Sequence, residues 1–263
     1  MHPDESLARR GGAEPSFRGW FEELERRYAS QFEFAEIRRA VQAISWRYVE
    51  ERGELHCRSV LDTRGKRAAY ALYYGPLHFL AVREVVTRLG LRSGCFGRIV
   101  DLGCGTGAGG AAWATACRSR PRVFGIDVHP WCLEESAWTY RYFRLDHQVR
   151  RGDLLAWCRP EPGDGFLAAY VIDELTEDAR SALLSKVRRC LKDGGTLLII
   201  EPISRRISRW MEEWEAALSG FSTRLDDWRF QVELPDLLER LDQAAGLRNS
   251  EEITCRTLLV KTR

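Results

Sequence analysis

The stretch Asp101-Leu102-Gly103-Cys104-Gly105-Thr106-Gly107 is the part of this sequence that decides its fold. It continues a short, mostly apolar run that begins with Ile99-Val100, and a helix is expected to begin directly after it, near Ala108. Gly103 and Gly105 allow the backbone to turn sharply, and they allow a ligand to approach without meeting a Cβ atom. The first turn of the helix adds N–H groups that have no partner inside the helix. The stretch therefore predicts a strand, a ligand-binding turn and a helix.

Short apolar segments alternate with helical segments downstream of this turn. Strands are expected at residues 122–126, 148–150, 165–168 and 196–200, and helices at residues 134–143, 177–191 and 235–245. This alternation is typical of an α/β fold with a doubly wound, mostly parallel sheet and helices on both faces. Residues 254–260 follow the last helix and are rich in β-forming side chains. We expect them to add an antiparallel C-terminal strand at the sheet edge.

The first third of the chain has a different pattern. Residues 1–15 are polar, which predicts a flexible tail. Apolar side chains recur at helical spacing through residues 16–95, which predicts an N-terminal helical cap on a domain formed by residues 96–263. Within the cap, we expect Gly75-Pro76 to end one helix before a second runs from about Leu77 to Leu89. Residues 203–232 are rich in arginine and tryptophan, and we expect a helical insert there.

The composition excludes several classes of protein. The 263 residues carry a net charge of +2, which neither requires nor excludes RNA as a partner. No apolar run approaches the roughly 20 residues that span a bilayer, and the first residues lack the apolar core of a secretory signal. We therefore expect a cytoplasmic protein without a membrane partner. The eight cysteines form no C-x-x-C pair, so we expect no metal site.

The glycine turn admits two cofactors. With Ala108 in the last place it also fits the dinucleotide pattern G-x-G-x-x-A, so a nicotinamide enzyme is a competing interpretation. Asp127 ends the second strand, where a carboxylate can accept both ribose hydroxyls of NAD or of S-adenosylmethionine. Asp153 follows the third strand, where a carboxylate can accept the adenine amino group. Either acid could instead cap a helix.

Four segments together favour S-adenosylmethionine. Residues 101–107, 125–127, 152–153 and 191–202 resemble, in order and spacing, the successive motifs of class I S-adenosylmethionine-dependent methyltransferases, and the resemblance covers residues 98–263. It implies a Rossmann-like fold and S-adenosyl-L-methionine as the cofactor. It also implies that the glycine loop holds the methionine part, Asp127 the ribose and the region of Asp153 the adenine. The cofactor-binding residues that it implies are Asp101, Gly103, Cys104, Gly105, Gly107, Asp127, Val128, Asp153 and Leu154.

A weaker resemblance extends upstream of the glycine turn. Residues 67–78, together with residues 171–175 and Glu201-Pro202, are similar to the mitochondrial ribosomal small-subunit methyltransferase-like family. This chain lacks the clustered cysteine ligands of that family. The resemblance implies ribosomal RNA or a ribosome-associated protein as an alternative methyl acceptor.

Candidate catalytic residues lie in two segments. Methyl transfer is an in-line displacement, so the enzyme aligns a nucleophile, excludes water and can remove a proton. After the fourth strand, Tyr170 can place its ring beside the sulfonium, and Asp173 is a candidate base or substrate-amine anchor, or else a helix cap. In the cap, Tyr74 and His78 flank the expected helix break, and we expect them to face the sulfonium. Packing between helices is the alternative for both, and the favoured one for Tyr70.

The tryptophans of the expected insert have two interpretations. Trp210 and Trp214 share a helix face, so they either pack onto the cap or form a wall of the substrate site. In the second case an anionic substrate group would be held by Arg205, Arg206, Arg209 and Arg224.

The sequence thus favours a methyltransferase that acts on a heteroatom of a small molecule. Two alternatives remain: a methyltransferase for ribosomal RNA or a ribosome-associated protein, and an enzyme that cleaves or cyclises S-adenosylmethionine.

Overall fold

The protein is described by a computed structural model that covers residues 14–50, 61–155, 161–192, 194–203, 209–246 and 252–262. Within these residues a seven-stranded sheet has the order β3-β2-β1-β4-β5-β7-β6. The strands are β1 (Arg98–Leu102), β2 (Arg122–Asp127), β3 (His147–Arg151), β4 (Gly165–Ala169), β5 (Thr196–Glu201), β6 (Ser222–Gln231) and β7 (Glu252–Lys261). β7 runs antiparallel to both of its neighbours, and the pairs among β1 to β5 are parallel. The predicted α/β fold class is confirmed.

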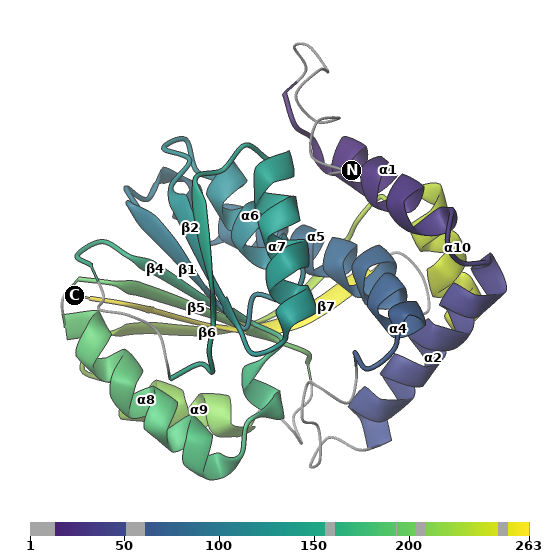
Figure 1. The fold of residues 1–263 in the computed structure, drawn as a ribbon. Helices are drawn as coiled ribbons and strands as arrows, with labels where there is room; N and C mark the ends of the chain where they lie inside the picture. Colours follow the sequence, from purple (N-terminus) through teal and green to yellow (C-terminus); the bar gives the residue numbers. More distant parts are fainter. Residues whose placement is uncertain are drawn as a thin grey trace.

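The sheet divides two apolar cores, because successive side chains of a strand point to opposite faces. One face packs against α5 (Gly75–Arg88), α6 (Ala108–Ala116) and α7 (Pro130–Tyr142), and its core includes Ile99 and Leu198. The other face packs against α8 (Glu177–Lys192) and α9 (Arg209–Ala217), with Val100 and Leu197 (Figure 1). β1 is buried along its whole length, as a central parallel strand covered on both faces must be.

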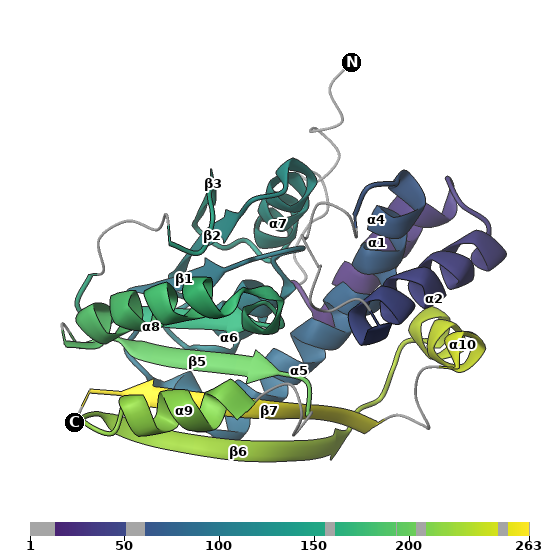
Figure 2. The same ribbon diagram turned by 90° about the horizontal axis from the view of Figure 1, so that it is seen from below.

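The cap is built from helices of both ends of the chain. α1 (Phe17–Ala29), α2 (Phe34–Glu50) and α4 (Arg64–Ala69) lead through a π-helical turn, η4 (Tyr70–Tyr74), into α5. α10 (Asp236–Ala245) lies beside α2 (Figure 2). The buried Tyr73 hydroxyl donates to Asp242 Oδ1 at 2.5 Å, which joins α10 to the π-helical turn. On the other side of the cap, Arg27 donates two hydrogen bonds, of 2.9 and 3.0 Å, to the carboxylate of Glu135 in α7.

The expected helix break at Gly75-Pro76 is wrong. Tyr74 and Gly75 both have right-handed helical dihedrals, and the chain continues from the π-helical turn directly into α5. The Gly75 N–H donates to the carbonyl of Tyr70, five residues earlier, and Pro76 stands at the start of α5. Proline is tolerated at the first turn of a helix because the N–H that it lacks would have no helical partner there.

The expected helical insert at residues 203–232 is also wrong in its second half. α9 is followed by strand β6, which occupies the sheet edge, so that β7 lies between β5 and β6. Charged residues alternate along β6 with partly buried ones, as suits an edge strand, and they hide its apolar pattern in the sequence. The expected tail falls largely outside the described residues. No helix within the described ranges is long and apolar enough to cross a membrane.

Candidate functional site

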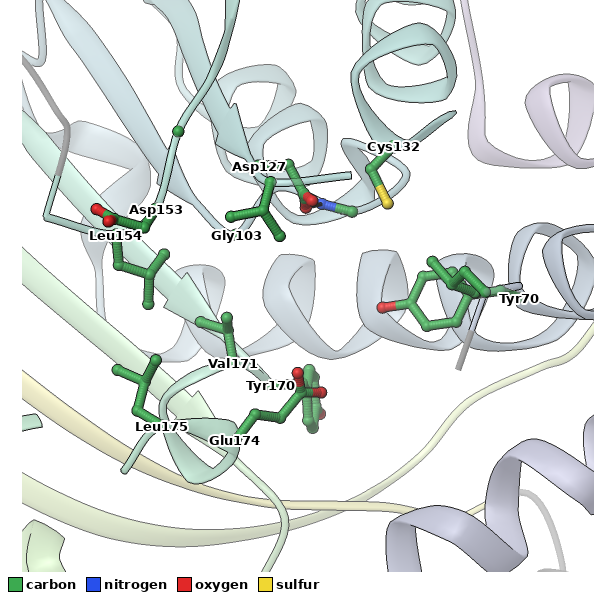
Figure 3. Close-up of a pocket in the computed structure, with 14 residues that line it drawn as sticks. Tyr70, Gly103, Asp127, Cys132, Asp153, Leu154, Tyr170, Val171, Glu174 and Leu175 are labelled. Carbon is green, nitrogen blue, oxygen red and sulfur yellow. Dashed lines mark hydrogen bonds between the residues drawn. The ribbon is translucent and has the colours of Figure 1, made fainter. Parts of the chain in front are cut away.

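A cavity of about 540 Å³ lies at the carboxyl ends of β1, β2, β3 and β4, between the sheet and the cap (Figure 3). The chain leaves β1 toward β2 on one side, while β4 pairs with β1 on the other. Open α/β sheets bind ligands at such a point. The lining residues come from the cap, the glycine loop, the end of β2, α7 and the segments after β3 and β4: Leu61, Tyr70, Gly103, Gly105, Asp127, Val128, Cys132, Gly152, Asp153, Leu154, Tyr170, Val171, Glu174 and Leu175.

The glycine loop has the conformation that its sequence predicts. Gly103, Gly105 and Gly107 have φ angles of +66°, +50° and +75°, in the left-handed region that favours glycine. A Cβ atom at Gly103 would lie 2.5 Å from Cγ2 of Val171, and one at Gly107 would lie 2.8 Å from Cα of Ser136. The loop therefore needs glycine both for its backbone and for its close approach to the neighbouring segments.

Asp127 lies at the centre of the cavity wall. Its Oδ2 accepts a hydrogen bond from the Gly105 N–H at 2.9 Å, and its Oδ1 accepts one from the His129 N–H at 2.8 Å. Burial raises its pKa, and these two N–H donors act in the opposite direction. A carboxylate offers about four acceptor positions, so the group retains capacity for a ligand diol. The capping alternative is wrong, because the cap of α7 is His129, whose Nδ1 accepts from the Trp131 N–H at 3.1 Å.

The segment after β3 lines the side of the cavity away from the cap. Asp153 is exposed, and its Oδ1 accepts a hydrogen bond from the Leu155 N–H at 2.7 Å, which closes a tight turn. Leu154 and Val128 also line the cavity, and Leu154 is buried. An acidic group at the mouth and apolar side chains beside it suit a flat heterocycle with an exocyclic amino group.

Asp101, at the end of β1, and Cys104, in the glycine loop, are buried and are not among the residues that line the cavity. Asp101 Oδ2 accepts hydrogen bonds from the Tyr140 hydroxyl at 2.8 Å and from the Gly110 N–H at 2.9 Å. The Cys104 N–H donates to the carbonyl of Ile126 at 2.9 Å. Both residues thus hold the loop to its neighbours.

Burial raises the pKa of Asp101 to about 7. The folded state therefore holds this proton more tightly than the unfolded state, so the contribution of Asp101 to stability falls as pH rises from about 4 through 7. Asp101→Asn keeps an acceptor for the Gly110 N–H and removes the titration. Urea denaturation between pH 5 and 7.5 is expected to show the variant gaining roughly 1–2 kcal/mol relative to the wild type. Parallel stability curves would contradict the shifted pKa.

Four rings form a cluster between the cap and the segment after β4. His78 stacks on Tyr170 with centroids 4.1 Å apart and planes 12° apart, and Tyr70 stacks on Tyr74 at 5.5 Å. Tyr70 and Tyr170 line the cavity, whereas Tyr74 and His78 lie behind them. The Tyr74 hydroxyl points to the carbonyl of Val41 at 3.5 Å, and burial raises its pKa. The ring facing the cavity from the cap is thus Tyr70, which the sequence analysis interpreted as packing.

The segment after β4 wraps around a carboxylate that the sequence analysis did not identify as part of the site. Oε1 of the buried Glu201 accepts hydrogen bonds from the N–H groups of Val171, Ile172 and Asp173, at 3.2, 2.7 and 3.3 Å. Just before them, Tyr170 has a φ of +58°, a left-handed conformation that is rare for a residue with a side chain. Such strain persists where the surroundings hold it, and it is commonly found at functional sites.

Of the two adjacent acids after β4, Glu174 lines the cavity and Asp173 does not. Asp173 Oδ1 accepts a hydrogen bond from the Trp210 indole N–H at 2.6 Å. The two acids belong to a 3₁₀ turn, Ile172–Glu174, in which successive side chains point about 120° apart. The cap alternative for Asp173 is wrong, because the residue before this turn is Val171 and no side chain caps it.

The tryptophans do not form a substrate wall. Trp210 and Trp214 pack into the core between α9 and the sheet, rather than onto the cap, and Trp228 lies on the opposite face, where its indole N–H donates to Thr257 Oγ1 at 2.8 Å. Arg224 pairs with Asp226 at 2.8 Å on the edge strand. Arg205 and Arg206 lie outside the described residues. Nowhere in the described ranges do three or more His, Cys, Asp or Glu side chains gather as a metal site.

The chain is similar to known proteins both in sequence and in structure. Residues 99–195 match a methyltransferase domain family. A candidate O-methyltransferase from Nostoc punctiforme superposes with a TM-score of 0.55 at 14% sequence identity, over 86% of this chain and 69% of that chain. A magnesium protoporphyrin IX methyltransferase from Synechocystis, solved with bound S-adenosylmethionine, superposes with a TM-score of 0.50 at 17% identity, over 71% of this chain and 80% of that chain. No curated protein matches the sequence. At these identities the two superpositions show a shared fold.

Proposed function

Because residues 99–195 of this chain form a methyltransferase domain of the Rossmann-like, S-adenosylmethionine-dependent class, we propose that the enzyme methylates a heteroatom of a small molecule. The observation that carries this proposal is the cavity of about 540 Å³ beneath the cap, a size typical of sites for small ligands. Two of its lining residues, Leu61 and Tyr70, come from the cap, so a small acceptor can be enclosed and water excluded.

The lining residues fit the cofactor. Gly103 and Gly105 leave room for close approach of the methionine part, and Asp127 has acceptor capacity for the ribose hydroxyls. Asp153 would accept from the adenine amino group, with Val128 and Leu154 against the ring. S-adenosylmethionine supplies an electrophilic methyl group on a sulfonium. The work of the protein is to align a nucleophile with that carbon.

The ring cluster is proposed to form the acceptor side of the site. Tyr170 is the candidate to lie beside the sulfonium, because its ring lines the cavity and is held by the stacked His78. His78 and Tyr74 act in this proposal as positioning residues for Tyr170 and Tyr70. Asp173, bound to Trp210, is proposed to fix the turn that carries Glu174.

The predicted cytoplasmic location belongs to the same proposal. The buried Cys104, Cys117 and Cys255 are not in disulfides, which supports it because such thiols are typical of reducing compartments.

Binding can be tested with two ligands that contain adenosine. At about 100 times its dissociation constant, S-adenosylhomocysteine should raise the free energy of unfolding by about 2.7 kcal/mol, measured by thermal shift and calorimetry. NAD serves as the comparison ligand and should have no effect. A response to NAD alone would overturn the proposal.

The acceptor class can be tested with methyl-labelled S-adenosylmethionine. The enzyme is incubated separately with metabolite, protein and RNA fractions of a cell extract, and label is expected in the metabolite fraction together with S-adenosylhomocysteine. Label in RNA or protein would instead favour the ribosomal alternative. Breakdown of the cofactor in buffer, without transfer of label, would favour cleavage or cyclisation.

A further inference from the structure

The part of the cavity next to β4 combines one carboxylate with two phenol rings. Glu174 and Tyr170 reach it from the segment after β4, and Tyr70 reaches it from the cap. Figure 3 shows Glu174 and Tyr170 on the side of the segment after β4, with the hydroxyl of Tyr70 directed into the cavity from the side of the cap. A ligand placed between these walls contacts negative charge and the faces or edges of aromatic rings.

The charge of the cavity has one sign. Its acidic lining residues are Asp127, Asp153 and Glu174, and neither lysine nor arginine is among the lining residues in the part of the chain that the structure describes. Two of the acids, Asp127 and Asp153, are assigned to the cofactor. Glu174 remains for the acceptor. Among the described lining residues an anionic acceptor would meet acidic side chains, which disfavour it, whereas a cationic acceptor gains from them.

The rings favour a cation for a second reason. The face of a phenol ring is negative and attracts a desolvated ammonium by about 1–2 kcal/mol. The ring of Tyr170 is held by its stacking on His78, and its backbone precedes the N–H groups bound by Glu201. Tyr70 is stacked on Tyr74 and lies edge-on to Trp131, with centroids 6.4 Å apart. Rings that are already held in place lose little freedom when a ligand binds.

We propose that the methyl acceptor is an amine on a compact apolar body, which enters as the ammonium and is bound by Glu174 between Tyr70 and Tyr170. This inference rests on the proposed function and names its substrate class.

The reaction that follows is balanced within the site. One ammonium proton passes to the Glu174 carboxylate, and the freed lone pair on nitrogen forms the new N–C bond. The C–S bond breaks and its electron pair stays on sulfur. The products are the N-methylated ammonium and S-adenosylhomocysteine, and Glu174 then releases its proton to water.

Three probes of one shape and different charge test the charge preference. Phenethylamine, 2-phenylethanol and 3-phenylpropanoate share the phenylethyl body and present a cation, a neutral hydroxyl and an anion. Each is titrated by ligand-observed NMR into the whole protein saturated with S-adenosylhomocysteine. The amine is expected to bind about tenfold or more tightly than the other two, as one charge-assisted contact implies.

Two variants assign the preference to Glu174. Glu174→Gln keeps the size of the side chain and removes its charge, so it should weaken binding of phenethylamine about tenfold and leave that of 2-phenylethanol unchanged. Glu177→Gln removes an exposed acid three positions further on, at the start of α8, and should change neither. The affinity for S-adenosylhomocysteine should be the same in all three proteins.

The outcomes separate this inference from the proposed function. If S-adenosylhomocysteine fails to bind the wild-type protein, the proposed function fails and the inference with it. If it binds but the amine shows no preference over the alcohol and the anion, the inference alone is overturned. A Glu174→Gln protein that loses affinity for S-adenosylhomocysteine but not for the amine would assign the carboxylate to the cofactor, which also overturns the inference. The preference of the wild-type protein decides the question even if the variant fails to fold.

Discussion

Asp127→Asn is expected to weaken binding of S-adenosylhomocysteine about 100-fold. The carboxylate is the acceptor proposed for both ribose hydroxyls, and charge-assisted hydrogen bonds contribute about 1.5–3 kcal/mol each. Its two oxygens also accept from the N–H groups of Gly105 and His129. Asparagine has one oxygen, so whichever way its amide is turned, its NH₂ group would face one of these donors. Isothermal titration calorimetry measures the loss.

An exposed acid provides the control for this variant. Asp146 lies just before β3, at the other end of the parallel strands from the cavity, so Asp146→Asn should bind the ligand as the wild type does. Circular dichroism and thermal unfolding check that both variants are folded. Normal affinity in Asp127→Asn would show that the carboxylate serves only the loop and α7, and that the ribose is held elsewhere.

Gly107→Ala is expected to lower the free energy of unfolding by about 3 kcal/mol or more. The φ of +75° costs roughly 1–2 kcal/mol for a residue with a Cβ atom. The added Cβ would also lie 2.8 Å from Cα of Ser136 and 3.0 Å from its carbonyl oxygen, atoms of the α7 backbone that cannot move independently. Overpacking of this kind adds about 1–3 kcal/mol. Urea denaturation followed by circular dichroism measures the change.

Two further glycines separate the two causes. Gly90 has a φ of +70° with no atom within 4 Å of an added Cβ, so Gly90→Ala should show the backbone cost alone, about 1–2 kcal/mol. Gly97 has neither a positive φ nor a neighbour within 4 Å, so Gly97→Ala should be within about 0.5 kcal/mol of the wild type. If Gly107→Ala costs no more than Gly90→Ala, the close approach of the loop to α7 is not a constraint on the fold.

The local sequence was sufficient to predict the central strand, glycine turn and helix of this protein and the class of its sheet. The strand, glycine turn and helix around residues 99–108 form as predicted because each depends on neighbouring residues: apolar side chains for the buried strand, and glycines for left-handed dihedrals. The parallel pairing of β1 to β5 follows from the alternation of strands and helices. Asp127 directly follows a predicted strand and Asp153 lies three residues after the next one, so the strand ends predict both acids near the cavity.

Only the tertiary structure decided which side chains face the cavity from the turn after β4 and from the cap. Asp173 and Glu174 are adjacent acids, and the local sequence does not distinguish which of them faces the cavity. Asp173 is bound by the indole of Trp210, which lies in a helix distant in sequence, and Glu174 lines the cavity. Tyr70 and Tyr74 share a helix face. The hydroxyl of Tyr74 points to the carbonyl of Val41 in α2, whereas Tyr70 lines the cavity.

The placement of β6 and α10 was decided in the same way. The charged residues of β6 obscure its apolar pattern in the sequence. The strand forms because all of its residues pair with residues of β7. α10 joins the cap through the contact between Asp242 and Tyr73, residues far apart in the chain. Sequence periodicity reports which residues are buried, but the partner that buries them is set by packing between segments that are distant in sequence.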